Sequence, residues 1–274
     1  MATYKIFASD LDATLLNDNL KVGEVNLAAI DKMREKGIEF IPVTGRCLAE
    51  VPNELLKGEK LRFIINSNGA SICNLKTKTT HITPLKKDSV KVILDTIKNY
   101  SVVLVSHSNN EDLVDTKECS EEVFREHRMS EAYNNIILPV SKRVENLRER
   151  LLNDIPTEML CLFFKYEEER QECFQKLKRV EGITPTSSIG GNMEILNSAV
   201  SKGTTLKNLA ATLGVKPSEI IAVGDNHNDM SLTDTAGLSL AVSNGVDELK
   251  QKADKVICSN NENIADYIYK NFIG

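Results

Sequence analysis

Short apolar runs alternate with helical patterns at both ends of this chain, and this alternation restricts the folds open to it. A short apolar run bounded by turn residues is typical of a strand buried on both faces, and apolar residues repeating every three or four positions are typical of a helix. A helix is predicted over 24–36, where Leu27, Ile30 and Met33 share one face and Gly37 provides a stop. The other elements predicted in these two regions are strands at 5–9, 38–43, 62–66, 220–223, 238–242 and 255–258, and helices at 202–213, from about 228, at 246–253 and at 262–272. The pattern predicts an α/β fold with a doubly wound, mainly parallel, Rossmann-like sheet.

The middle of the chain breaks this rhythm, because its helical segments are longer and more charged. Its predicted elements are helices at 142–152 and 167–180 and strands at 102–106 and 159–166. We therefore predict an inserted α+β domain at 85–188, within a core domain made of residues 1–84 and 189–274. Hinges are expected near Thr83-Pro84 and Ile189-Gly190-Gly191.

Composition narrows the classes of function. The 274 residues are enough for two domains, and the net charge of −5 gives no basic footprint for nucleic acid. No apolar stretch has the length needed to cross a bilayer and no signal-peptide pattern is present, so a cytoplasmic protein without a membrane partner is expected. The six cysteines form no C-x-x-C pair, which argues against zinc ligation and against a disulfide framework. No pattern indicates an oligomeric state.

Two carboxylates, Asp10 and Asp12, follow the apolar run Ile6-Phe7-Ala8. Ligands bind beyond the carboxyl ends of the strands in open α/β sheets, and a pair of acids there can hold a hard cation or attack a phosphorus centre. A D-x-D match alone is weak evidence, because acidic loops are common on protein surfaces.

Two further segments supply groups that suit an anion. Thr44-Gly45-Arg46 follows the second strand, where a hydroxyl and backbone amides form an anion cradle or simply a turn with a helix cap. Lys202 lies in the first turn of a predicted helix, against the preference of the helix dipole. It is tolerable there if it faces a phosphate or carboxylates, and otherwise it is a solvated lysine.

The loop from Gly224 to Asp229 follows the strand at 220–223 and is rich in oxygen donors. Oxygen donors suit magnesium better than they suit zinc or copper. The same loop is also consistent with an Asx-rich turn that caps the next helix through Asn228 or Asp229. His227 lies in this loop and is interpreted as loop structure, whereas His81, His107 and His127 are interpreted as surface or core residues.

Together these segments resemble the haloacid dehalogenase superfamily of phosphohydrolases, in particular its Cof-like members with a large α/β cap between the second and third motifs. The resemblance covers the whole core: D-x-D-x-T at 10–14, T-G-R at 44–46, the S-K-G lysine at 202 and G-D-x-x-N-D at 224–229. The N-G-A segment of the family is matched by Asn66-Ser67-Asn68-Gly69-Ala70. Ala13 is a departure, because the family usually has Gly there; a negative φ would tolerate the methyl group, and a positive φ would weaken the loop that carries Asp12.

The resemblance implies a magnesium-dependent hydrolase of small phosphomonoesters. In that scheme Asp10 is the nucleophile of an aspartyl-phosphate mechanism, and Asp12 is the acid and base. The residues implied as phosphate ligands are Thr44, Gly45 and Lys202, those implied as possible substrate contacts are Arg46 and Asn68, and those implied around Mg²⁺ are Asp10, Asp12, Asp225, Asn228 and Asp229.

The inserted domain would act as a cap that selects the substrate, with polar loops at 106–110 and 187–192 as candidate contacts. No motif identifies the substrate, so small sugar phosphates, flavin-type phosphates and other phosphorylated metabolites stay open. Two alternatives also remain: a phosphomutase-type phosphoryl transferase on the same core, and a catalytically weakened phosphometabolite-binding protein, which Ala13 makes plausible.

Overall fold

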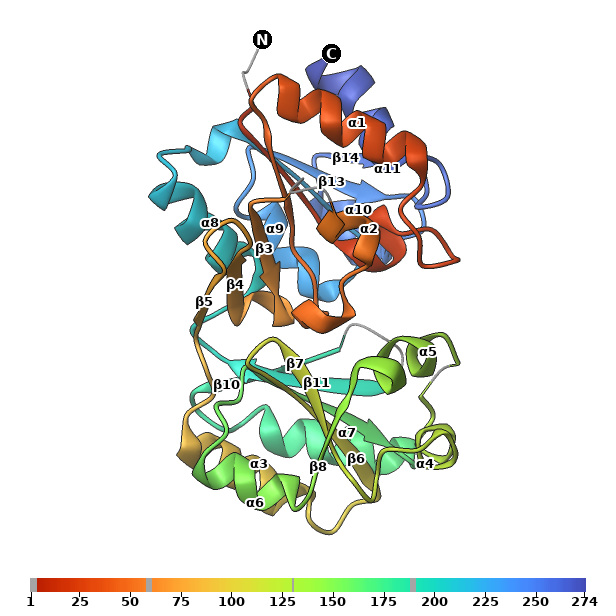
Figure 1. Cartoon of the computed structure of the whole chain (residues 1–274), viewed down its shortest axis with the longest axis vertical. Helices are drawn as coiled ribbons and strands as arrows, with labels where there is room; N and C mark the ends of the chain where they lie inside the picture. The colour runs from red at the N-terminus through yellow and green to blue at the C-terminus, as the bar shows by residue number, and fades with distance from the viewer. Residues whose placement is uncertain (1–3, 58–60, 130, 188–190) are drawn as a thin grey trace. The chain divides into compact units, whose positions relative to one another are not determined.

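The computed structural model describes residues 4–57, 61–129, 131–187 and 191–274 (Figure 1). The chain divides into two compact units: the first comprises residues 1–45, 51–81 and 201–274, and the second comprises 46–50 and 82–200. These limits differ from the predicted ones by a few residues at 84 and by more at 189, and the short segment 46–50 groups with the second unit. Of the predicted hinge at 189–191, only Gly191 lies within the described residues.

The first unit is built on a five-stranded parallel sheet in the order β14-β13-β12-β1-β2. Its strands are β1 (Ile6–Ser9), β2 (Glu39–Pro42), β12 (Ile220–Gly224), β13 (Leu238–Val242) and β14 (Lys255–Ile257). The central strands β1 and β12 are buried along their whole length, as continuous apolar runs predict. This arrangement confirms the predicted doubly wound α/β fold.

A small three-stranded sheet, in which β3 and β4 pair antiparallel, and a set of helices complete this unit. The sheet contains β3 (Phe63–Asn66), β4 (Ser71–Asn74) and β5 (Thr79–Ile82), and Val43 pairs with Ile65 in parallel to join it to the end of β2. The helices are α1 (Glu24–Glu35), α2 (Asn53–Leu56), α8 (Lys202–Thr212), α9 (Met230–Thr233), α10 (Asp247–Lys252) and α11 (Ile264–Ile268).

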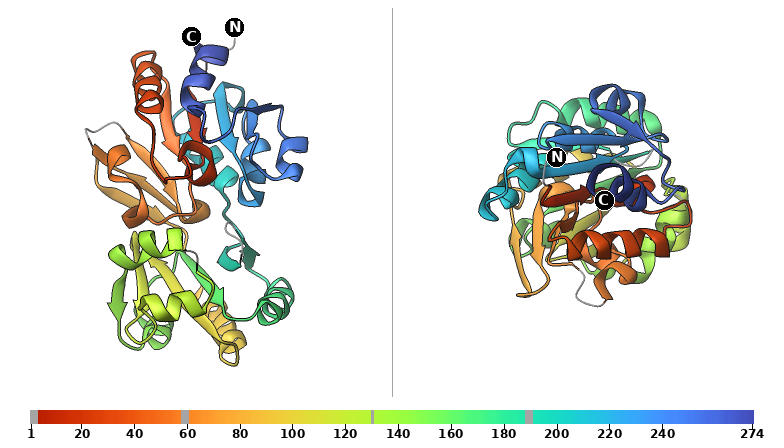
Figure 2. Two further views of the ribbon diagram at one scale, coloured as in Figure 1. Left: turned by 90° about the vertical axis from the view of Figure 1, so that its right-hand side faces the viewer. Right: turned by 90° about the horizontal axis from the view of Figure 1, so that it is seen from above.

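Side chains alternate between the two faces of β1, so Ile6 and Ala8 pack in one cluster with Leu206 and Leu209 of α8, while Phe7 stacks on Phe40. Helices α1 and α11 lie side by side in Figure 1 and Figure 2, and the Asn26 side chain of α1 accepts a hydrogen bond from the Ala265 N–H of α11. The helix predicted at 24–36 and its stop at Gly37, with φ +78°, are confirmed.

The second unit contains a six-stranded sheet in the order β10-β11-β9-β6-β7-β8, antiparallel except for the β7–β8 pair. Its strands are β6 (Val102–Ser108), β7 (Glu111–Asp115), β8 (Lys142–Val144), β9 (Met159–Phe164), β10 (Ile183–Thr186) and β11 (Asn192–Asn197). Its helices are α3 (Lys87–Ile97), α4 (Glu121–Glu126), α5 (Glu131–Val140), α6 (Leu147–Asn153) and α7 (Glu167–Leu177). One face of the sheet packs against α3, α6 and α7, and the other packs against Phe124 of α4 and Ile137 of α5.

Two predictions in the second unit are wrong. The predicted helix at 142–152 is strand β8 followed by helix α6, because 142–144 pairs with β7 and Asn146 takes a left-handed conformation with φ +53°. The Asp115 carboxylate then accepts the Leu147 N–H at 3.0 Å and starts α6. The predicted loop at 106–110 is also mostly strand, since Ser106, His107 and Ser108 are buried in β6. In the loop predicted at 187–192, residues 188–190 lie outside the described part and Asn192 begins β11.

No helix within the described residues has the length and apolar character to span a membrane.

Candidate active site

Asp10 stands directly after β1, at the carboxyl edge of the central sheet. Its N–H continues the ladder by donating to the Val223 carbonyl of β12 at 3.0 Å, so the backbone that carries the carboxylate is held by both the strand and its neighbour. The chain then turns through Leu11–Leu15, and the Thr14 hydroxyl donates to Asp225 Oδ1 at 3.1 Å. The turn therefore ties the first motif to the fourth.

Ala13 has φ +52°, in the region that favours glycine. The left-handed conformation costs a residue with a Cβ about 1–2 kcal/mol. The Asn244 side chain donates to the Ala13 carbonyl at 2.7 Å, and Thr14 is fully buried, so the turn forms despite this strain. The sequence left open whether the φ of Ala13 is negative or positive, and in the structure it is positive.

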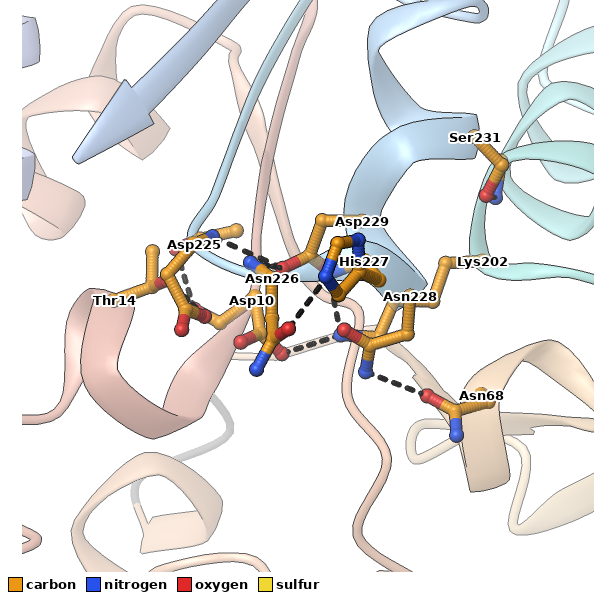
Figure 3. A network of polar contacts seen from close by, with 12 residues as sticks. Asp10, Thr14, Asn68, Lys202, Asp225, Asn226, His227, Asn228, Asp229 and Ser231 are labelled. Carbon is orange, nitrogen blue, oxygen red and sulfur yellow. Dashed lines mark hydrogen bonds and ion pairs between the residues drawn. The ribbon is translucent and has the colours of Figure 1, made fainter. Parts of the chain in front are cut away.

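Lys202 begins α8 and is 1% exposed. Its Nζ donates to Asp10 Oδ1 at 2.7 Å and to Asp229 Oδ1 at 2.6 Å (Figure 3). The helix start is fixed by a capping box between Ser201 and Thr204. The unfavourable position of a cation at a helix N-terminus is offset here by two buried carboxylates.

Gly203 explains why a small residue follows the lysine. A Cβ at this position would lie 1.9 Å from the Ser231 carbonyl oxygen, and the Gly203 N–H donates to Ser231 Oγ at 2.9 Å. Helices α8 and α9 can therefore approach closely only because residue 203 has no side chain.

The loop after β12 is organised by Asp229. Its Oδ2 accepts hydrogen bonds from the backbone N–H groups of Asp225 at 3.0 Å and Asn226 at 3.1 Å, while its Oδ1 accepts from Lys202. A Cβ on Gly224 would lie 2.5 Å from the Asp229 side chain. Asp229 thus folds the loop and holds the lysine, which leaves Asp10 and Asp225 as the acids better placed to hold a cation.

A further part of the site comes from the segments that follow β2 and β3. The Asn68 N–H donates to the Thr44 carbonyl at 3.0 Å, and Asn68 Oδ1 accepts from Asn228 Nδ2 at 3.1 Å. A Cβ on Gly45 would lie 3.3 Å from Asn68 Oδ1, so the glycine lets this asparagine approach. Asn68 itself takes a left-handed conformation with φ +52°, which asparagine tolerates.

Arg46 belongs to the second unit rather than to this cluster. Its Nη1 donates to the Glu50 carbonyl at 2.7 Å, and the residue is 7% exposed. The first unit therefore brings together Asp10, Thr44, Gly45, Asn68, Lys202, Asp225, Asn228 and Asp229 of the predicted site residues, with Asp12 half-buried in the first-motif turn. His227 is exposed, as its interpretation as loop structure implied.

Burial, and after it like charges at close range, perturb the pKa values of the acids of the site. Burial, with Asp229 as the next contributor, raises the pKa of Asp10 well above its usual value, although Lys202 lowers it. Burial and Asp229 also raise the pKa of Asp225 to about 6. For Lys202, burial lowers the pKa, but the carboxylates of Asp10 and Asp229 outweigh burial and raise it above the usual value. The site holds more negative charge than its one buried lysine offsets.

This donor set fits a hard divalent cation. Carboxylate oxygens of Asp10, Asp225 and Asp229 lie within 4.8 Å of one another. Asn228 Oδ1 is buried and accepts no hydrogen bond from any described residue. All these donors are oxygens, which suits Mg²⁺.

Sequence reasoning missed Ser231 and Asn244, which support the lysine helix and the Ala13 turn. Neither lies in a motif, and both reach the site only through tertiary packing, so the sequence carries no signal for them.

Comparison with known proteins gives a consistent result. A family model described as haloacid dehalogenase-like hydrolase matches residues 7–268. Phosphatase YwpJ of Bacillus subtilis is 27% identical over 98% of this chain and 100% of its own length. A 5-amino-6-(5-phospho-D-ribitylamino)uracil phosphatase, YwtE of Bacillus subtilis, is 27% identical over 96% of both chains.

Among solved structures, a haloacid dehalogenase-like hydrolase from B. subtilis superposes with a TM-score of 0.86 at 25% identity, covering 98% of this chain and 99% of that one. The family match, the full-length likeness to phosphatases and the arrangement of the four motifs agree, and the chain belongs to the haloacid dehalogenase-like hydrolases.

Proposed function

We propose that this protein is a magnesium-dependent phosphatase that hydrolyses small phosphomonoesters through an aspartyl-phosphate intermediate. The observation that carries the proposal is the position of Asp10, whose carboxylate is held by Lys202 and lies next to Asp225 at the carboxyl edge of the sheet. A carboxylate fixed in this way is presented to a ligand as a nucleophile.

In the first step an Asp10 oxygen attacks phosphorus and the bond from phosphorus to the ester oxygen breaks. Asp12, two residues further along the turn, gives its proton to the leaving alkoxide, which departs as an alcohol. In the second step Asp12 accepts a proton from water, and the water oxygen attacks phosphorus, releasing inorganic phosphate and free Asp10.

The phosphoryl oxygens carry developing negative charge in both steps. We assign their stabilisation to Lys202 and to the hydroxyl and backbone amides of Thr44 and Gly45. Mg²⁺, held by Asp10, the Asp12 carbonyl and Asp225, would offset the repulsion between the anionic nucleophile and the anionic substrate. Asp229 would position Lys202 and the metal loop, with Asn228 beside them.

The substrate class is a small phosphorylated metabolite. Support comes from relatives at 27% identity, one of which is named for a phosphorylated ribityl compound. We assign the choice among such substrates to the second unit, acting as a cap. None of the six cysteines is in a disulfide, which fits the reducing cytoplasm as the proposed location.

The test is phosphate release from an aryl phosphate and from a panel of phosphorylated metabolites, with and without Mg²⁺. Asp10→Asn is expected to lower turnover by about 10⁴-fold or more, because the nucleophile is lost. Asp247→Asn is the matched control, since that carboxylate is 82% exposed at the start of α10 and should change nothing. Rapid acid quench of the wild-type protein should trap one phosphoryl group on Asp10.

Two outcomes would indicate a different function. Transfer of phosphate to an added sugar in place of water would indicate a phosphoryl transferase on the same core. Binding of phosphorylated metabolites without turnover would indicate a binding protein, and the strained turn at Ala13 is the feature that keeps this possibility open.

A further inference from the structure

A second buried polar cluster lies in the other unit, at one end of a sheet face that is otherwise apolar. On this face of β6, β7 and β9 the residues Val103, Val105, Val114 and Phe163 belong to a hydrophobic cluster. Two positions further along, the same face carries His107 of β6 opposite Asp112 of β7. Both are buried, at 1% and 0% exposure.

The segment 46–50 brings two more ligand-type side chains to this end of the face. Atoms of Cys47, Glu50 and Asp112 that can bind a metal all lie within 4.8 Å of one another. His107 Nε2 lies 3.3 Å from Asp112 Oδ1 and 3.9 Å from Glu50 Oε2. The cluster therefore joins a thiol, two carboxylates and an imidazole.

Asp112 is a fully buried carboxylate that faces the imidazole of His107. Neither of its carboxylate oxygens has a partner with good hydrogen-bond geometry among the described residues, although the side chain is fully buried and lies beside His107 and the Cys47 thiol. His107 is close to Oδ1 without the alignment of a hydrogen bond. Buried carboxylates are normally hydrogen-bonded or coordinated to a metal.

The acids of the cluster also favour a bound cation. Glu50 and Asp112 place two buried carboxylates within 4.8 Å of the Cys47 sulfur. A divalent cation at the centre would compensate these acids and allow the thiol to ionise.

The backbone around the cluster is held in place. The Cys47 N–H donates to Glu50 Oε2 at 2.6 Å, which sets the turn, and the Ala49 N–H donates to the Asn110 carbonyl at 3.1 Å, which ties the turn to the β6–β7 hairpin. The ligands thus come from a tight turn and from paired strands, and such elements position a metal site well.

We infer that Cys47, Glu50 and Asp112, with His107 as the fourth ligand, form a binding site for a zinc-class divalent metal ion. A tetrahedral zinc has Zn–O, Zn–N and Zn–S bonds of about 2.0–2.3 Å, so its ligand atoms are roughly 3.3–3.7 Å apart. The contacts of His107 Nε2 at 3.3 Å and 3.9 Å lie close to this spacing. Thiolate and imidazole ligands select zinc over magnesium. The proposed site departs from the expectation drawn from cysteine spacing, because its ligands form no C-x-x-C motif.

The first experiment measures metal bound to the intact protein. After expression with zinc and extensive exchange into Mg²⁺ buffer, the wild-type chain should retain about one equivalent of zinc. Asp112→Asn should lower zinc retention by about tenfold or more, whereas Asp10→Asn, which alters the acid cluster of the first unit, should retain zinc fully. Equal zinc content in wild type and Asp112→Asn, or no zinc in either, would overturn the site.

A spectroscopic experiment identifies the thiolate. Co²⁺ added to the metal-free protein should give a thiolate-to-cobalt charge-transfer band. Cys47→Ser should lose this band, and the matched control Cys173→Ser, which removes another buried thiol of the second unit, should keep it. Because a serine variant could fold poorly, Cys47→His supplies a ligand at the same place and should bind Co²⁺ without the band. Absence of the band in the wild-type protein would refute thiolate ligation.

Discussion

Each unit of this protein contains one buried acidic cluster, and the two differ in the atoms that they offer. The cluster of the first unit presents only oxygens, and a buried lysine, Lys202, partly neutralises it. The cluster of the second unit adds the sulfur of Cys47 and the imidazole of His107, and its Asp112 carboxylate has no partner with good hydrogen-bond geometry among the described residues. The comparison teaches that the kinds of donor atom, rather than the presence of acids, decide which cation a cluster suits.

The lysine is the feature that most separates the two clusters, and removing it should have the largest effect. Lys202→Met leaves the carboxylates of Asp10 and Asp229 buried without a cation, and we expect a loss of roughly 3–5 kcal/mol in the free energy of unfolding. Activity should also be lost. Urea denaturation without Mg²⁺ measures the first effect and phosphate release the second.

The control for this change is Lys207→Met, an exposed position on the same helix, which should alter neither quantity. Adding Asp229→Asn to the Lys202→Met chain should restore part of the stability, because it removes one buried charge. A Lys202→Met protein as stable as the wild type would show that the acids are compensated in another way.

Chelation should distinguish the two clusters, because different metals should restore the activity and the stability that a chelator removes. A strong chelator is expected to abolish activity and to lower the melting temperature of the zinc-loaded protein. A site occupied at a hundred times its dissociation constant contributes about 2.7 kcal/mol, which corresponds to roughly 5–11 °C for a chain of this size. Differential scanning calorimetry should show that zinc, not magnesium, restores the melting temperature, while magnesium restores activity. If magnesium restored both, the site in the second unit would have no support.

Acid should weaken magnesium binding at the first cluster. Burial and Asp229 raise the pKa of Asp225 to about 6, so below that pH a proton competes with the metal. The apparent affinity for Mg²⁺ should fall by about tenfold for each pH unit below 6. The same shift makes the metal-free protein gain stability as the pH falls from 6 towards 4, because the folded state then binds more protons than the unfolded state.

Mg²⁺ titrations of the wild-type protein at pH 7.5, 6 and 5 check this dependence, and Asp225→Asn should make it shallower, with Asp10 as the remaining ligand whose pKa is raised. An affinity independent of pH across this range would mean that Asp225 stays ionised.

The smallest effect concerns the backbone of the first cluster. Ala13→Gly should stabilise the protein by about 1 kcal/mol, because glycine adopts φ +52° without strain. Ala29→Gly, in the middle of α1, should destabilise by about 1 kcal/mol or more, since a helix interior disfavours glycine. Thermal unfolding of both variants tests whether the backbone φ decides if a change to glycine raises or lowers the stability. Destabilisation by both changes would contradict this account.

Much of the first cluster was predictable from the sequence. Asp10, Thr44 and Asp225 each follow a buried apolar strand, and parallel strands bring their carboxyl ends to one edge of a sheet. The local pattern therefore fixed both the fold class and the side on which these residues gather. The positive φ of Ala13 was not predictable, because a tripeptide does not reveal the hydrogen bonds from Asn244 and Thr14 that hold the turn.

The second unit was less predictable. Residues 142–144 carry a helix-like pattern, but pairing with β7 makes them a strand, because a tertiary neighbour outweighs weak local preference. Likewise the polar stretch from Ser106 to Ser108 looks like a loop and is buried strand.

The sequence by itself determined the order of strands and helices, and with it the edge where the motif residues meet, because burial on two faces leaves a periodic signature in the chain. Only the tertiary structure decided that Cys47, His107 and Asp112 share one end of a sheet face. These residues are brought together by a hairpin and a distant turn, and contacts between segments far apart in the chain leave no spacing pattern that a sequence can show.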